Sequence, residues 1–207
     1  MRFPSLPGCW SAVFVCLAIP AVVARPYHVL INHVGSTDPA TEGWRRVVVR
    51  NQGTVSEKPI AADPVGNLPA WSIDDDGTGA APIALNYQLS PGFSDAGNMT
   101  RGGWRYVLHL RVVEGASTPN FSICGEVATL VRRYMIRFTS DETGDTVVAL
   151  GLKGPVLTAR VPGNGYHRFV MDYTPTPDGS GMVSVSVDDT PEPLLADHPG
   201  ELAANVA

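Results

Sequence analysis

The chain has 207 residues, a net charge of −5, and 44% hydrophobic against 17% charged residues. This length and composition predict one globular domain with a core of its own. The acidic balance gives phosphate backbones no long-range attraction, and no basic tail offsets it, so the sequence argues against a nucleic-acid partner.

The N-terminus has the pattern of a secretory signal peptide. Arg2 supplies the positive start, an apolar run covers 11–24, and small residues at its end, up to Ala24, suit a cleavage site. We expect 1–24 to be removed and the mature protein to be secreted, either extracellular or periplasmic; an uncleaved anchor or a buried helix is the alternative. No second run of membrane length follows, so no membrane span is expected after cleavage. The mature chain then keeps one cysteine, Cys124, which we interpret as a small buried hydrophobe.

Before residue 100 the pattern is irregular. A strand and turn are predicted over 47–53, and a long surface loop rich in Pro, Gly and Asp over 57–82. This loop contains Asp74 and Asp76 in a run of three aspartates. A solvated loop explains the run, and a structural calcium ion is the alternative, because neighbouring carboxylates suit a hard cation. The sequence indicates no other metal or cofactor.

After residue 100 the apolar residues recur with a period of two, which predicts half-buried strands. In the stretch 103–113 one face carries Trp104, Tyr106, Leu108, Leu110 and Val112. The same alternation predicts strands over 132–140, 146–152, 155–161, 166–173 and 182–189, with turn-forming clusters between them. Because no helical period persists, we predict an all-β, antiparallel two-sheet sandwich. An irregular tail is expected over 191–207.

Several short motifs, taken together and in order, resemble one known family. They are "DPATEGW" (38–44), "PAWSIDDD" (69–76), "GGWRYVLHLRVVE" (102–114), "YMIRFTSDETGDTVVAL" (134–150), "GYHRFVMDY" (165–173) and "VSVDD" (185–189). They resemble concanavalin A-like, laminin-G-like jelly-roll domains of secreted bacterial proteins. The resemblance implies a jelly roll over 25–190. The sequence departs from the family at two points. Asp189 stands where the family usually has a turn glycine, and we expect the closing strands that usually follow to be missing, as in a truncated copy.

The family resembled includes retaining glycoside hydrolases, which need two carboxylates about 5 to 5.5 Å apart. On a strand this requires acidic residues two apart on one face, and no predicted strand has them. Asp188 and Asp189 are successive residues of the strand predicted over 182–189, so they are expected to point to opposite faces. No nucleophile elbow or zinc-binding motif occurs either. We therefore expect a protein that is not an enzyme.

A basic constellation is the remaining candidate site. If the strands predicted over 104–112, 132–139 and 166–173 share one sheet, their polar faces gather Arg105, His109, Arg111, Arg133 and Arg137. Arginine forks suit carboxylate and sulfate groups, so an acidic glycan is a sensible ligand. The alternative is that arginine is simply this chain's outward-facing strand residue.

These observations favour a lectin-like recognition or adhesion module that binds a glycan or a cell-surface protein. Three alternatives stay open: a glycoside hydrolase, an accessory domain of a sialidase-like enzyme, and a truncated structural fragment. Fold resemblance supports the first reading, and fold alone is a weak basis for function.

Overall fold

The computed structural model describes residues 32–33, 35–48, 55–75, 85–89, 99–113, 123–129, 132–152, 154, 156–177 and 180–202. The signal peptide expected over 1–24 lies outside these residues. The described part contains a short 3-10 helix η1 (Pro39–Glu42), one helical turn over 99–102, and the strands β1 (Arg45–Val48), β2 (Val55–Ile60), β3 (Ala70–Asp75), β4 (Leu85–Gln88), β5 (Trp104–Leu110), β6 (Ile123–Ala128), β7 (Arg132–Ser140), β8 (Thr146–Leu150), β9 (Leu157–Val161), β10 (His167–Thr174), β11 (Met182–Val187), β12 (Leu195–His198) and β13 (Glu201–Leu202).

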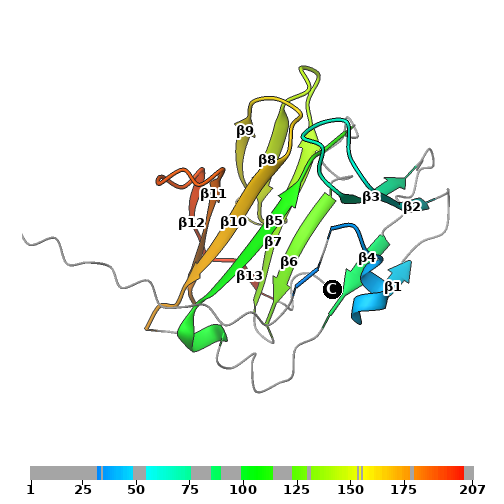
Figure 1. Ribbon diagram of the computed structural model, residues 1–207. Coiled ribbons are helices and arrows are strands. Elements are labelled where there is room, and N and C mark those ends of the chain that lie inside the picture. The colour runs from blue at the N-terminus through cyan, green and yellow to red at the C-terminus, as the bar shows by residue number, and fades with distance from the viewer. Residues whose placement is uncertain are drawn as a thin grey trace, which may run out of the picture.

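Two antiparallel sheets form the body of the molecule (Figure 1). One has the strand order β12–β11–β10–β5, and we call it the β5 sheet. In the other, which we call the β7 sheet, β7 pairs with β6, with β8 and with β13, and β8 pairs in turn with β9. The expected all-β, antiparallel architecture is thereby confirmed.

The core lies between the facing sides of these two sheets. Alternate residues of β7 and β8 are buried, and so are Phe169, Met171 and Tyr173 of β10. Across the interface the ring centroids of Phe138 and Phe169 lie 4.7 Å apart. The period of two in the sequence therefore reports which side of each strand meets the other sheet, as expected for a two-sheet sandwich.

An aromatic cluster closes one end of this core. The rings of Trp104 and Tyr173 stack with centroids 5.3 Å apart and an interplanar angle of 3°, and Tyr134 packs edge-on against both. Gly181 and Gly200 lie against these rings with positive φ angles of 52° and 69°. A side chain at either position would overlap a tyrosine ring, so these two glycines are required by close approach as well as by backbone conformation.

The N-terminal third differs from the prediction of a long loop over 57–82. β2 and β3 form a hairpin in this region, and β1 pairs separately with β4. Glu57 of β2 joins the two pairs, because it accepts hydrogen bonds from Arg46 of β1 at 2.6 Å and from the hydroxyl of Tyr87 in β4. A proline and a three-aspartate run hide this hairpin from pattern analysis, since both are unusual within strands.

The irregular tail expected over 191–207 is wrong for its central part. β12 pairs with β11 at the edge of the β5 sheet, and the short β13 pairs with the start of β7. Leu195 and His198 are buried, and Arg132 of β7 donates a hydrogen bond of 2.9 Å to the carbonyl of Pro199. The segment thus contacts both sheets, although strands of four and two residues are too short to show a period.

Cys124 is exposed, so the prediction of a buried cysteine is wrong. It lies on β6 with its side chain on the outer face of the β7 sheet, because the next residue, Gly125, faces inward against Tyr106. The surrounding protein still limits solvation of the sulfur, which raises the pKa of the thiol, and the Glu126 carboxylate adds to that shift.

Candidate functional site

The structure does not bring the five predicted site residues together. β5 and β10 do pair, but β7 belongs to the other sheet, so the condition of a single sheet is not met. Arg105, His109 and Arg111 lie on or just after β5, on the outer side of the β5 sheet. The other two, Arg133 and Arg137, lie on the outer side of the β7 sheet, because the residues that alternate with them, Tyr134, Ile136 and Phe138, face the core. The two groups are separated by the whole thickness of the sandwich.

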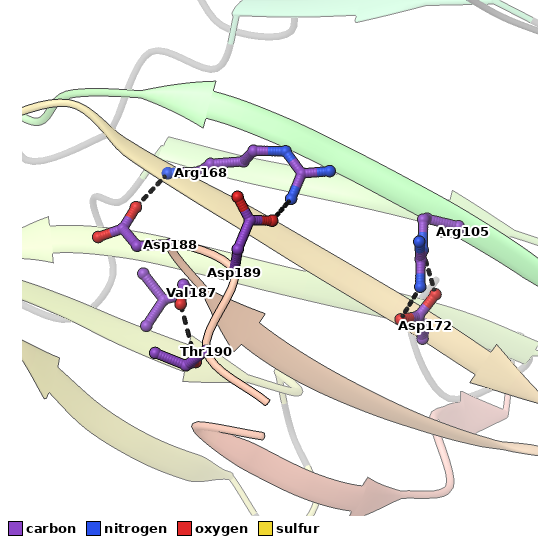
Figure 2. A network of polar contacts seen from close by, with 7 residues as sticks. All are labelled: Arg105, Arg168, Asp172, Val187, Asp188, Asp189 and Thr190. Carbon is purple, nitrogen blue, oxygen red and sulfur yellow. Dashed lines mark hydrogen bonds and ion pairs between the residues drawn. The ribbon is translucent and has the colours of Figure 1, made fainter. Parts of the chain in front are cut away.

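Carboxylates already neutralise most of these arginines. Arg105 makes a bidentate ion pair with Asp172 of the neighbouring strand, with distances of 2.7 and 2.8 Å (Figure 2). On the other sheet Arg133 pairs with Glu126 of β6. Such cross-strand pairs are expected where opposite charges face each other on a sheet surface. They favour the alternative in which these arginines are outward-facing strand residues.

Arg111 differs because its ion pair is buried. One of its terminal nitrogens donates to both carboxylate oxygens of Asp63, at 3.0 and 2.7 Å, and the exposed fractions of the two side chains are 10% and 5%. The guanidinium also lies 5.8 Å from the ring centroid of Tyr166. Asp63 belongs to the loop that joins β2 and β3, and this loop arches toward the end of β5 (Figure 1). The Asp63–Arg111 pair therefore fastens the β2–β3 hairpin to the sandwich.

The loop itself is preorganised to present Asp63. The Asp63 side chain accepts a hydrogen bond of 2.8 Å from the amide of Val65, and its backbone carbonyl accepts one of 3.0 Å from the amide of Asn67. Asn67 has a φ of 53°, a left-handed conformation that asparagine tolerates well. Prediction from sequence missed Asp63, although the Asp-Pro-Val-Gly-Asn turn around it is a local signal that the loop is ordered.

Asp188 and Asp189 lie in a turn and not on a strand, so the prediction that they point to opposite faces is wrong. β11 ends at Val187, whose carbonyl accepts a 3.0 Å hydrogen bond from the amide of Thr190. The two aspartates between them have φ values of 50° and 58°, the positive values of a type I′ turn. Both carboxylates consequently reach β10 (Figure 2).

The contacts of this turn tie it to the start of β10. Asp188 accepts a 2.9 Å hydrogen bond from the amide of Arg168 and lies 2.7 Å from Nδ1 of His167. Asp189 forms an ion pair with the Arg168 guanidinium. Three of the four oxygens of the two carboxylates are thus engaged by neighbouring residues of one strand.

The turn geometry predicts how substitutions of Asp189 change the stability of the protein. Glycine favours the second central position of a type I′ turn, so Asp189→Gly should change the free energy of unfolding by less than about 1 kcal/mol, despite loss of an exposed ion pair. Asp189→Val, which also loses the ion pair, should cost roughly 1–3 kcal/mol because a β-branched residue is strained at positive φ. Urea unfolding of both variants measures the difference, and equal losses would contradict the assigned turn.

His109 is exposed on the outer side of the β5 sheet. Its ring centroid lies 5.5 Å from that of Tyr166, and its partner in the strand register is Arg168. The proximity of His109 also helps to lower the pKa of the Asp188 carboxyl. We therefore define an end cluster, made of Asp63, His109, Arg111, Tyr166 and Asp188, where the β2–β3 loop, the ends of β5 and β10, and the turn after β11 converge.

Hydrogen bonds and charges in and around the end cluster lower the pKa of both of its carboxyl groups. The hydrogen bond from Arg111 is the main cause for Asp63, with the amide of Val65 adding to it. For Asp188, partial burial opposes the shift, but the amide of Arg168 and the ring of His167 outweigh it. Burial raises the pKa of the Tyr166 hydroxyl, and the nearby Asp63 carboxylate acts in the same direction.

These shifts predict how stability depends on pH. A carboxyl whose folded pKa lies below its unfolded value of about 4 contributes stability that is complete above that value and is lost as pH falls through the folded pKa. The melting temperature should therefore fall on acidification below about pH 4, and Asp63→Asn should melt lower at neutral pH but show a smaller acid-induced fall. Thermal melts across this range are the measurement, with Glu192→Gln, an exposed position in the loop after β11, as the control. The same acid-induced fall in Asp63→Asn as in the wild type would contradict this assignment.

Of the two calcium candidates, the structure describes only Asp74. Asp74 is exposed on β3, and Asp76 lies outside the described residues. Within the described ranges, no three His, Cys, Asp or Glu side chains lie close enough together to hold a metal ion.

The sequence matches no family model and no curated protein. In the part of the chain that the structure describes, no helix is both long enough and apolar enough to cross a membrane.

Proposed function

We propose that this chain is an exported, noncatalytic recognition module of the concanavalin A-like jelly-roll type, which binds a glycan at the end cluster. The observation that carries the proposal is the convergence of four chain segments at the end cluster, where an exposed imidazole, a tyrosine and carboxylates lie together. Ligand sites commonly occur where loops bring a few polar groups together on a rigid scaffold. The sequence-level resemblance supports the jelly-roll class and the signal-peptide pattern supports export.

The paired charges favour an uncharged glycan over the acidic glycan suggested by the sequence. An anionic ligand at Arg105 or Arg111 would have to displace Asp172 or Asp63 and would then face the displaced carboxylate. Sugar hydroxyl groups instead donate to carboxylates and accept from imidazole or guanidinium groups without breaking these pairs. A neutral, hydroxyl-rich ligand is therefore the better match to this surface.

The same contacts support the proposed noncatalytic role. A retaining glycosidase needs one carboxylate as nucleophile and another as acid, both facing the substrate. In the end cluster Asp63 is held by Arg111, and Asp188 is held by His167 and the amide of Arg168. Both are committed to holding the loop and the turn in place.

The test is a glycan array probed with the secreted protein, with and without calcium, followed by titration of any ligand found. His109→Ala should weaken binding about tenfold or more, which corresponds to about 1.4 kcal/mol. Thr158→Ala, at an exposed position on β9 of the other sheet, is the matched control and should bind normally. Unchanged binding by His109→Ala would overturn the assigned site, and binding to no glycan would favour a purely structural module.

A further inference from the structure

The loop between β9 and β10 contains a sequence with chemistry of its own. Asn164 is followed by Gly165 in this loop, and Tyr166 comes next, directly before the start of β10 at His167. The asparagine is exposed, and the loop around it, 162–165, consists of bends rather than regular structure. An exposed asparagine before a glycine carries an amide that its own backbone can attack.

There is open space beside Gly165. A Cβ placed on this residue would meet no atom beyond its chain neighbours within 4 Å, so nothing occupies the side on which a side chain would project. Gly165 itself has no side chain to shield its amide nitrogen or to restrict the rotations that bring the nitrogen toward the Asn164 side chain. Asn67, by contrast, donates a hydrogen bond from its backbone N–H to the carbonyl of Asp63. It is followed by Leu68, whose branched side chain restricts the backbone more than glycine does.

We propose that Asn164 is a site of spontaneous deamidation. The backbone nitrogen of Gly165, after losing its proton to base, attacks Cγ of Asn164; a new C–N bond closes a five-membered succinimide, and the side-chain amide leaves as ammonia. Water then opens the ring at either carbonyl. One product is aspartate and the other is isoaspartate, in which the main chain runs through the former side chain. The only co-reactant is water, and no oxidation occurs.

The modification acts next to the end cluster. Gly163 is anchored by a 2.8 Å hydrogen bond from its amide to Asp145, and Tyr166 is held beside Arg111, so the reacting residues lie between two fixed points. Isoaspartate adds one carbon to the backbone between these points, and both products add a negative charge. The expected consequence is a displaced Tyr166 and a weaker fit of the β2–β3 loop, whether or not the cluster binds a glycan.

The experiment is to incubate the purified full-length protein in mildly alkaline buffer and to follow the peptide that contains Asn164 by mass spectrometry. Isoaspartate is detected separately by enzymatic methylation. We expect conversion of Asn164 well before Asn67, at a rate that rises with pH because the attacking nitrogen must lose a proton. The Asn67 peptide serves as the internal control.

Two variants keep the proposal testable. Gly165→Ala should fold normally, since there is space for the methyl group and the backbone is outside the left-handed region, and it should slow conversion by roughly an order of magnitude. Asn164→Gln should show no conversion over the same period. The proposal is wrong if the Asn164 peptide stays unmodified or is converted no faster than the Asn67 peptide. It is also wrong if the Asn164 peptide is converted at the same rate in Gly165→Ala as in the wild type.

Discussion

Gly181→Ala is expected to lower the free energy of unfolding by roughly 3 kcal/mol or more, the sum of a strained backbone and an overpacked core. A Cβ on Gly181 would lie 1.9 Å from an atom of the Tyr173 ring, and φ at this position is +52°. The ring cannot move away easily, because it stacks on Trp104 and its hydroxyl donates to the carbonyl of Thr100. Urea unfolding of the purified variant measures the loss.

Two other glycines separate the causes of this loss. Gly144 has a φ of +84° but open space around it, so Gly144→Ala should cost only about 1 kcal/mol from backbone strain. Gly165 has neither a positive φ nor a close contact at its Cβ position. Gly165→Ala should therefore be neutral or stabilising by up to about 1 kcal/mol. Equal losses for Gly181→Ala and Gly144→Ala would show that the contact with Tyr173 carries no weight.

The central strands could be predicted from sequence because their burial alternates with every residue. β7, for example, buries Tyr134, Ile136 and Phe138 and leaves the residues between them half-exposed. The period of two identifies such strands before any partner is known. It does not identify which strands pair, so the sequence alone cannot tell whether β7 shares a sheet with β5 and β10. The structure places β7 in the opposite sheet.

The short peripheral strands could not be predicted for a different reason. β12 and β13 owe their position to contacts made elsewhere, such as the burial of Leu195 and the hydrogen bond from Arg132 to Pro199. β2 contains Pro59, which local propensity would exclude from a central strand. Tertiary contacts outweighed weak local preferences at each of these positions.

The candidate site shows the same limit more strongly. Sequence reasoning selected Arg111 and His109 as basic residues, but it had no means of finding their partners, since Asp63 lies 48 residues before Arg111. For the other arginines the sequence left open either a binding face or ordinary outward-facing strand residues. The cross-strand carboxylates that neutralise Arg105 and Arg133 favour the second. Positive charge in a sequence becomes a binding surface only where the fold leaves it uncompensated.

Arg111→Ala is expected to destabilise the protein more than any other substitution of the five predicted site residues. Removing the guanidinium leaves the Asp63 carboxylate buried without its partner, and an unpaired buried charge is far more costly than a lost surface ion pair. The melting temperature should fall by several degrees, and amide hydrogen exchange should increase in 61–69, the loop that the pair holds. Arg105→Ala, which breaks an exposed pair, is the matched control and should change the melting temperature little.

A double-mutant cycle then tests whether the Asp63–Arg111 ion pair itself, rather than the packing around it, holds the β2–β3 loop in place. Asp63→Ala alone removes the carboxylate and leaves the guanidinium of Arg111 unpaired, so it too should destabilise. The variant with both substitutions should be more stable than the two single losses would give by addition, because no unpaired charge remains. Amide hydrogen exchange in 61–69 should be faster than in the wild type in all three variants, since each lacks the Asp63–Arg111 ion pair. Additive losses together with normal protection of the loop would mean that the hairpin is held by other contacts, and that the end cluster does not depend on this ion pair for its shape.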